Sequence, residues 1–311
     1  MLPKKAKPMT KLRFGPYSVE TSNTEKIFFP DSGITKGDVI DYYQHIADTM
    51  MRHLRDRPLN MQRFPDGITD DGFFQKEISD YFPEWIDRIK VRKQGGSNTQ
   101  VVCNNAATLV YLANQACLTP HVWLSSIRSL DNPDRLVFDL DPSGPEFAAV
   151  RQATRLIVDF LKDLELPVYV QTTGSRGLHV IVPIDGSEGY ESVRKFARNI
   201  AGIMAHDYPD LLTVEQRKDK RDAPVFIDTG RNAYGQTMVT PYAIRALAGA
   251  PIATPIELDE LDDPRLNAQR YNLGNIFRRM ARRKDPWFGI GRTAKSLKDA
   301  RRYLKRITHS E

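Results

Sequence analysis

The feature that most constrains this chain is a pair of carboxylates, Asp139 and Asp141, that follows the apolar run 136–138. The run predicts a buried strand, which Pro142 and Gly144 end. Side chains alternate between faces along a strand, so the two aspartates point the same way and lie side by side. Two like charges are costly to bury there unless a cation lies between them. The pattern therefore predicts a divalent cation with oxygen ligands, Mg²⁺ or Mn²⁺, and chemistry on phosphate groups.

A second polar segment, residues 172–180, combines a turn with donor side chains. Gly174 and Gly177 predict a tight turn whose backbone N–H groups can face a ligand. Arg176 adds a positive charge with a fork geometry suited to phosphate, and His179 in the following strand can donate to a phosphate oxygen. A lone histidine in a strand is more often structural, but its place just after this turn favours a role in binding.

A third segment, residues 225–245, carries another carboxylate at a strand end. Asp228 follows a short apolar strand and is a candidate third ligand, since two cations need more than two acidic side chains. The alternative is a turn-forming aspartate before Thr-Gly. Four polar or basic neighbours could hold a triphosphate or a sugar: Arg231, Asn232, Gln236 and Arg245. The three segments together are typical of a nucleotide site that performs two-metal phosphoryl transfer.

Helices and strands are expected to alternate without a strict β-α-β rhythm, which favours an α+β fold of mixed sheets flanked by helices. Apolar spacing predicts helices over 36–55, 104–117, 146–164 and 188–206, and strands over 59–64, 168–174, 177–184, 226–228 and 237–242. Residues 65–100 are polar and rich in turn signals, so they predict loops, and the chain from 257 predicts mainly helix.

Composition excludes several classes of protein. The 311 residues are 41% hydrophobic, yet no stretch approaches the roughly 18 apolar residues of a membrane span. The N-terminus is basic and lacks the apolar region of a signal peptide, so we expect a cytoplasmic protein associated with the bacterial nucleoid. The two cysteines, Cys103 and Cys117, are too few for a disulfide framework or a four-cysteine zinc site, and reduced structural thiols are expected.

The net charge of +6 is modest, but basic residues gather near the C-terminus. Such a stripe is either an electrostatic footprint for nucleic acid or a solvated helix face, and the sequence does not decide between them. Its members are Arg278, Arg279, Arg282, Arg283, Lys284, Arg292, Lys295, Lys298, Arg301, Arg302, Lys305 and Arg306.

The motifs DLDP, TTGSRGLHV and FIDTGRNAYGQTMVTPYAIR resemble those of the archaeo-eukaryotic primase superfamily. They are most similar to the polymerase domain of bacterial end-joining ligases of the ligase-D type. The likeness runs from about residue 22 to 288. Four upstream segments also match the pattern of this family: EKIFFPDSGITKGDVIDYY, RPLNMQRFPDGI, GFFQK and HVWLSS. The resemblance implies an RRM-like primase-polymerase core. We therefore expect a basic tail over 1–13, a catalytic domain over 14–290 and a basic C-terminal helix or tail over 291–311.

The resemblance also implies residue roles. The metal ligands would be Asp139, Asp141 and Asp228. Contacts to the incoming nucleotide would come from Thr173, Arg176, Gly177, His179, Arg221, Arg231, Gln236, Arg245 and His121. Lys26 and Lys36 would bind a 5′-phosphate beyond a gap, and Phe73 and Phe74 would stack on template bases, although an FF pair is more often core packing. Thr173 and Arg176 stand where the family more often has serine and lysine, and Arg231 precedes Asn232 where a glutamine is commoner; we expect tuning and no loss of function.

The implied function is a DNA-dependent nucleotidyltransferase that fills short gaps in DNA repair. It would add rNTPs or dNTPs to a primer 3′-hydroxyl with two Mn²⁺ or Mg²⁺ ions and prefer a downstream 5′-phosphate. The chain carries no ligase or nuclease module, so a stand-alone polymerase working with a separate DNA ligase is expected. End joining or excision repair as the pathway, and priming without a primer, stay open.

Two alternatives belong to other classes. A haloacid dehalogenase-type phosphatase also places Asp-x-Asp at a strand end, but it requires Thr or Val two residues later, where Ser143 stands. A non-catalytic DNA-end-binding protein that recruits a ligase would use the basic residues but gives no reason for the three aspartates.

Overall fold

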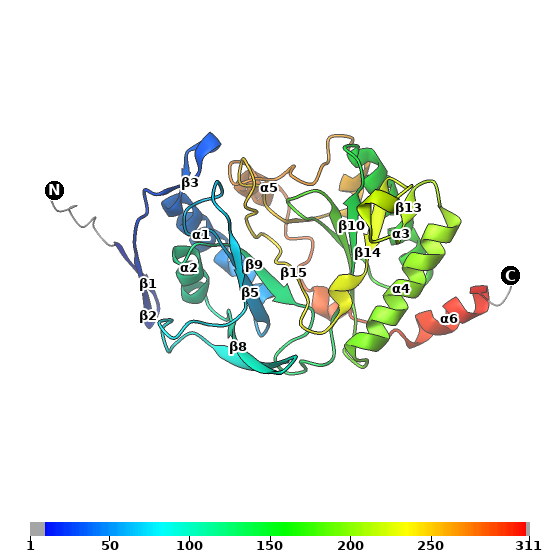
Figure 1. Ribbon diagram of the computed structural model, residues 1–311, viewed down its shortest axis with the longest axis horizontal. Coiled ribbons are helices and arrows are strands. Elements are labelled where there is room, and N and C mark those ends of the chain that lie inside the picture. Colours follow the sequence, from blue (N-terminus) through cyan, green and yellow to red (C-terminus); the bar gives the residue numbers. More distant parts are fainter. Residues whose placement is uncertain (1–9, 309–311) are drawn as a thin grey trace.

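A computed structural model describes residues 10–308. Two six-stranded sheets form the two halves of the molecule, and the longer helices lie on their outer sides (Figure 1). The N-terminal half is drawn in blue and cyan, and the half that carries residues 135–213 is drawn in green and yellow. This arrangement confirms the expected α+β class of mixed sheets flanked by helices.

The first sheet has the order β15-β9-β5-β8-β7, and β6 pairs with β5. Its strands are β5 (Pro58–Arg63), β6 (Phe73–Gln75), β7 (Arg88–Lys93), β8 (Gly96–Val102), β9 (Cys117–Trp123) and β15 (Thr237–Val239). Helices α1 (Lys36–Leu54) and α2 (Ala106–Asn114) pack with it in one apolar core. Helix α1 begins with the Thr35–Asp38 capping box that its sequence indicates.

The expectation of loops over residues 65–100 is wrong, because β6, β7 and most of β8 lie there. Gly95 lies in the turn between β7 and β8 and Gly96 begins β8, and their φ angles of 75° and 150° suit glycine. Strand β7 reads Arg-Ile-Lys-Val-Arg-Lys and buries only Val91. It is an edge strand with charged side chains, so its pairing leaves little apolar signal in the sequence.

The second sheet has the order β13-β14-β10-β12-β11-β16. Its strands are β10 (Arg135–Pro142), β11 (Tyr169–Thr172), β12 (Leu178–Pro183), β13 (Leu212–Thr213), β14 (Val225–Asp228) and β16 (Thr254–Ile256). Helices α3 (Phe147–Asp163) and α4 (Tyr190–Asp207) cover one face. Leu136 and Phe138 pack against these helices, whereas Val137 belongs to the core of the first half. Asp139 and Asp141 share the parity of Val137 and therefore face the first sheet.

The chain ends differ from the expected tails. Strands β1 (Thr10–Phe14) and β2 (Tyr17–Thr21) form a hairpin, so residues 10–13 are not a loose tail; residues 1–9 lie outside the described residues. Strands β3 (Ile27–Phe29) and β4 (Ile34–Thr35) form a second small pair. Beyond residue 257, long irregular segments separate α5 (Ile276–Arg282) from α6 (Lys298–Thr308), so this region is only partly helical.

Helix α6 packs onto the second core through Leu304 and Ala300. Several arginines of the basic C-terminal stripe form ion pairs: Arg279 with Glu260, Arg283 with Asp259, Arg301 with Glu188 and Arg302 with Asp299. These pairs weaken the interpretation of the stripe as a nucleic-acid footprint. Among the described residues, no helix is both long and apolar enough to cross a membrane.

Candidate active site

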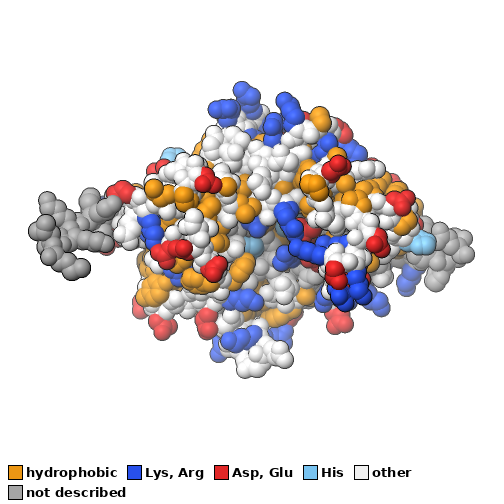
Figure 2. Space-filling view, turned by 45° about the horizontal axis from the view of Figure 1, so that its top comes forward, with side chains coloured by type: hydrophobic (Ala, Val, Ile, Leu, Met, Phe, Trp, Pro, Cys, Tyr) orange, Lys and Arg blue, Asp and Glu red, His pale blue; other side chains and the backbone are white. Residues whose placement is uncertain are grey.

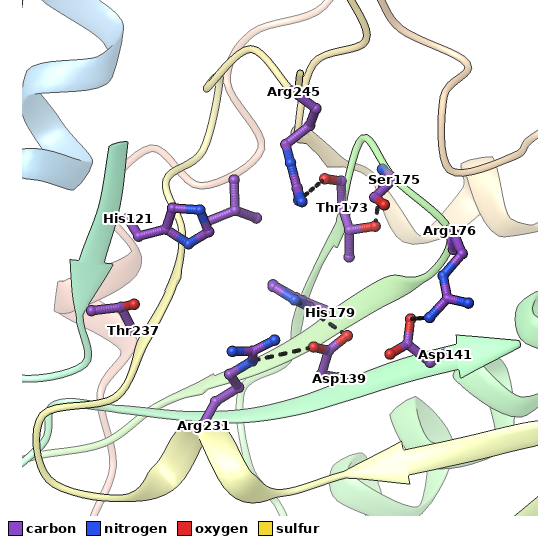
Figure 3. A pocket seen from close by; sticks show the side chains of 11 residues that line it. His121, Asp139, Asp141, Thr173, Ser175, Arg176, His179, Arg231, Thr237 and Arg245 are labelled. Carbon is purple, nitrogen blue, oxygen red and sulfur yellow. Dashed lines mark hydrogen bonds and ion pairs between the residues drawn. The ribbon is translucent and has the colours of Figure 1, made fainter. Parts of the chain in front are cut away.

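A hollow of about 190 Å³ lies between the two sheets (Figure 3). Figure 2 shows Lys and Arg side chains gathered beside the depression at the centre of the molecule. Strand β9 contributes one lining residue, β10 two, the β11–β12 turn and β12 four, and the segment from 231 to 245 the rest. The lining residues are His121, Asp139, Asp141, Thr173, Ser175, Arg176, His179, Arg231, Thr237, Val239 and Arg245.

Asp139 is the most enclosed carboxylate of the hollow, with 5% of its surface exposed. It lies opposite His179 in the β10–β12 register, and the Nε2 atom of His179 is 3.4 Å from its Oδ1. The Nε atom of Arg231 is 3.4 Å from its Oδ2. Burial alone would raise the pKa of Asp139, but His179 and Arg231 outweigh burial and hold this pKa at about 2. The carboxylate is therefore ionised at neutral pH.

Asp141 is more open and has one cationic partner in the hollow, Arg176, at 3.7 Å. Burial, followed by repulsion from the neighbouring Asp139, raises the pKa of Asp141 above its ordinary value. The side-by-side placement expected from the sequence is present, together with the repulsion that a cation would relieve.

The turn before β12 is held by Thr173. Its Oγ1 accepts the N–H of Ser175 and of Gly177 at 3.2 Å each and donates to the Gly177 carbonyl at 3.0 Å. Arg245 donates to the Thr173 carbonyl at 2.9 Å. A Cβ atom on Gly177 would lie 1.9 Å from the Leu140 carbonyl oxygen, so only glycine lets the turn lie this close to β10.

His179 is oriented by Gln171, which motif reasoning did not single out. The amide nitrogen of Gln171, a fully buried residue of β11, donates to the Val239 carbonyl at 3.3 Å and lies 3.1 Å from Nδ1 of His179. An N–H group facing Nδ1 makes this ring atom an acceptor, so the neutral ring carries its proton on Nε2, toward Asp139. Only the strand register that places Gln171 opposite His179 could have indicated this contact.

His121 closes the hollow on the side of the first sheet. Burial, then the positive charges of Arg245 and Arg231, lower the pKa of His121 well below its ordinary value. The ring is therefore neutral at physiological pH, and its Nε2 has no hydrogen-bond partner among the described residues. The ring of Phe74 meets it edge-on at 5.4 Å, which connects the predicted template surface to the predicted nucleotide pocket.

Asp228 lies directly opposite Asp139 in the β10–β14 register, but its side chain is not part of this hollow. Its Oδ1 accepts the Gly230 N–H at 2.6 Å, and the residue lines a neighbouring hollow beside α4. Among residues 10–308, no three His, Cys, Asp or Glu side chains converge as a metal site. The structure thus brings two of the three predicted ligands together and places the third one strand away.

Four of the other predicted residues do not line the hollow: Gly177, which lies in the turn beside it, and Arg221, Gln236 and Asn232. Arg221 donates to the carbonyls of Glu215 and Gln216 and stacks on Phe226, and Gln236 is exposed at the start of β15. Asn232 is fully buried and pairs with both backbone groups of Val137, so it serves the sheet and does not hold a ligand.

The predicted DNA contacts lie on the first half. The backbone N–H of Lys36 donates to the Lys26 carbonyl at 2.8 Å, so the two lysines are neighbours in space. The Lys26 ammonium contacts Asp66, and the Lys36 ammonium donates to the Ser22 carbonyl. Phe73 and Phe74 are 46% and 57% exposed, which excludes the core-packing alternative for both.

Comparison with known proteins assigns the family. The model of the LigD primase-polymerase domain matches residues 35–287. The chain belongs to this family. Membership confirms the resemblance and the expectation of a polymerase-type nucleotidyltransferase, and it excludes the dehalogenase-type phosphatase.

The relatives of this family member are longer proteins. It is 33% identical over 276 residues to the multifunctional non-homologous end joining DNA repair protein LigD of Mycobacterium tuberculosis, covering 86% of this chain and 36% of that protein. It is 28% identical to the bifunctional non-homologous end joining protein LigD of Bacillus subtilis, covering 88% of this chain and 44% of that protein. The chain therefore spans less than half the length of these curated relatives. The solved polymerase domain of Mycobacterium tuberculosis ligase D, in complex with DNA, matches with a TM-score of 0.83 and 30% identity over 89% of this chain and 99% of that one.

Proposed function

We propose that this protein is a DNA-dependent polymerase that fills short gaps during DNA repair, in the cytoplasm and together with a separate ligase. The observation that carries the proposal is the single hollow in which two adjacent carboxylates meet three arginines and two histidines. The relatives named for non-homologous end joining, and the similar domain solved with DNA, support end joining as the pathway. A primer 3′-hydroxyl attacks the α-phosphate of an incoming rNTP or dNTP, and pyrophosphate leaves.

The donor set of the hollow fits hard divalent cations, Mn²⁺ or Mg²⁺, because its acidic ligands are carboxylate oxygens. Asp139 and Asp141 would hold them, and Asp228 would join after turning away from the Gly230 N–H. Bound cations would lower the pKa of the attacking hydroxyl and neutralise charge on the triphosphate. Arg231 and Arg176, which now face the two aspartates, would then be released toward the phosphates.

The nucleotide would be held by groups with fixed positions. Arg245 is anchored on the Thr173 carbonyl, and the β11–β12 turn presents Arg176 beside it. His179 presents its Nε2–H to the same hollow because Gln171 occupies its other ring nitrogen. These donors are preorganised for a polyanion, so little reorganisation is needed when the triphosphate binds.

The 5′-phosphate beyond the gap would bind at Lys26 and Lys36. Burial, then the charges of Lys26 and Arg63, lower the pKa of Lys36 to about 8. No carboxylate pairs with Lys36 among the described residues, so the cluster has an excess of positive charge that an anion relieves. Phe73 and Phe74, exposed beside this cluster, would stack on template bases.

Primer extension on a gapped duplex tests this function. The assay uses a one- or two-nucleotide gap, Mn²⁺ or Mg²⁺, rNTPs or dNTPs, and a downstream strand with or without its 5′-phosphate. Template-matched incorporation that is stronger with the phosphate is the expected result. Tight binding without incorporation under either metal would overturn the proposal and favour a recruiting protein.

A further inference from the structure

We propose that the outer face of α4, at Arg194, Lys195 and Arg198, binds the sugar-phosphate backbone of the primer strand and leads its 3′ end to Asp228. The inference rests on the proposed function and adds a substrate path that the nucleotide hollow does not contain. It follows from three observations: two connected hollows, unpaired basic side chains, and the order of the strands.

Two hollows lie along α4: one is shared with residues 233–234, and the other with β14 and the segment before it. One has a volume of about 580 Å³ and is lined by Arg194, Lys195, Arg198 and Tyr234 among others. The other has a volume of about 330 Å³ and reaches Asp228. Arg198 lines both, so the surface is continuous from the first turns of α4 to the predicted third ligand.

The basic side chains of this surface lack the partners that other arginines have. Arg301 and Arg302 of α6 are ion-paired, as are Arg279 and Arg283. Within residues 10–308, no ion pair or hydrogen bond involves the side chains of Lys195 and Arg198, and the buried Nε of Arg194 has no acceptor. The acidic residues that line the two hollows are Glu191 and Asp228. Free guanidinium groups along a groove fit a phosphate backbone.

The strand order identifies which nucleic-acid strand lies here. The phosphate-binding groups of the nucleotide hollow, Arg176 and Thr173, come from the turn on the β12 side of β10. Asp228 belongs to β14, on the other side of β10. In phosphoryl transfer the attacking and leaving oxygens lie roughly in line across the phosphorus atom. With the leaving pyrophosphate on the β12 side, the attacking hydroxyl enters from the β14 side, where the α4 groove ends.

A pair of DNA ligands isolates this contact. One is a gapped duplex with its upstream primer, and the other is the same template with only the 5′-phosphorylated downstream strand. The variants are the double substitution R194Q/R198Q and the conservative R198K. Arg52→Gln serves as the matched control, since Arg52 is an exposed helical arginine on α1 and belongs to no proposed binding surface.

The double variant should bind the primer-containing DNA roughly tenfold or more weakly, since hydrogen bonds to charged groups are lost. The slope of log affinity against log salt should fall by about two, one for each phosphate contact. Binding of the primer-free ligand and the KM for the nucleotide should stay within about twofold of the wild type. R198K should keep most of the affinity, and R52Q should behave as wild type.

Equal weakening on both ligands, or no weakening on either, would overturn the assignment of a primer path. Melting temperatures of all variants show whether they fold, and if the double variant fails, the comparison of R198K with the single variant R198Q decides. The binding measurements need no catalysis. If the wild type incorporates no nucleotide, the proposed function is contradicted. The binding comparison still tests the α4 groove in that case, because it depends only on whether the double variant loses affinity for the primer-containing DNA.

Discussion

At the scale of single residues, Asp139 is the carboxylate of the hollow with the most partners, because both His179 and Arg231 lie beside it. It is nearly buried, yet His179 and Arg231 keep it ionised. Replacing it with asparagine keeps the volume and removes a proposed metal ligand. We expect D139N to lower extension by roughly a thousandfold or more, since several kcal/mol of charge stabilisation are lost. Binding to gapped DNA, measured by fluorescence anisotropy, should change little, because the proposed role of Asp139 is to hold a metal ion and not a DNA phosphate. Extension near the wild-type rate would remove Asp139 from the proposed mechanism.

Phe74 makes a second residue-scale prediction. It is 57% exposed, so Phe74→Ala should change the free energy of unfolding by only about 0.5 kcal/mol. Stacking on a base is worth about 1–3 kcal/mol, and template binding should weaken accordingly. Phe288→Ala is a matched control, since Phe288 is 61% exposed and lies over Arg52, away from the hollow. A large fall in the melting temperature of Phe74→Ala would show instead that the ring supports the fold.

At the scale of elements, the contact between the β11–β12 turn and β10 leaves no room for a side chain. A Cβ on Gly177 would overlap the Leu140 carbonyl, and backbone atoms on both sides cannot yield as a flexible side chain would. Gly177→Ala should therefore destabilise the protein by about 2–4 kcal/mol and displace Arg176 and His179. Chemical denaturation measures the first effect, and the KM for the nucleotide measures the second. Gly144→Ala faces open space and should leave both unchanged.

The elements also show how far sequence reasoning reaches. Helix α1 and strand β10 were predictable, because their apolar spacing is dictated by burial on one face or both. Strand β7 was not, since its side chains face solvent and its pairing is made by backbone groups. The same limit holds in the site. The spacing of Asp139 and Asp141 was enough to predict that they share one face of the strand. The hydrogen bond from Gly230 to Asp228 and the contact of Gln171 with His179 were not predictable, because they depend on how distant strands pair.

At the scale of the whole molecule, the two halves carry different parts of the substrate site. The proposed 5′-phosphate site, Lys26 and Lys36, belongs to the first half, and the two aspartates belong to the second. A DNA molecule that contacts both must span a fixed separation. The preference for a 5′-phosphate should therefore be strongest for short gaps and fade as the gap lengthens, when one end cannot reach both sites. Lys26→Ala should erase the preference for a 5′-phosphate at every gap length. The control Lys11→Ala, which removes a surface lysine near Glu20, should leave the preference unchanged.

The charge of Lys36 makes that preference depend on pH. The pKa of Lys36, about 8, lies below the ordinary value of 10.5, so the folded protein loses this proton at a lower pH than the unfolded chain does. Between these two values the unfolded chain binds more protons, and this residue makes the fold more stable with rising pH. Phosphate binding has the opposite trend, because it needs the ammonium form, while the phosphate itself is already doubly charged above pH 7.

We expect the ratio of kcat/KM on phosphorylated over unphosphorylated gaps to fall between about pH 7 and pH 9, since kcat/KM reports the free enzyme. The unphosphorylated gap, measured over the same range, corrects for every other titrating group. In Lys36→Met the ratio should be low and independent of pH, because no ammonium is left to lose. A wild-type ratio that stays constant across this range would assign the preference to Lys26 alone and leave Lys36 as a support for the Ser22 carbonyl.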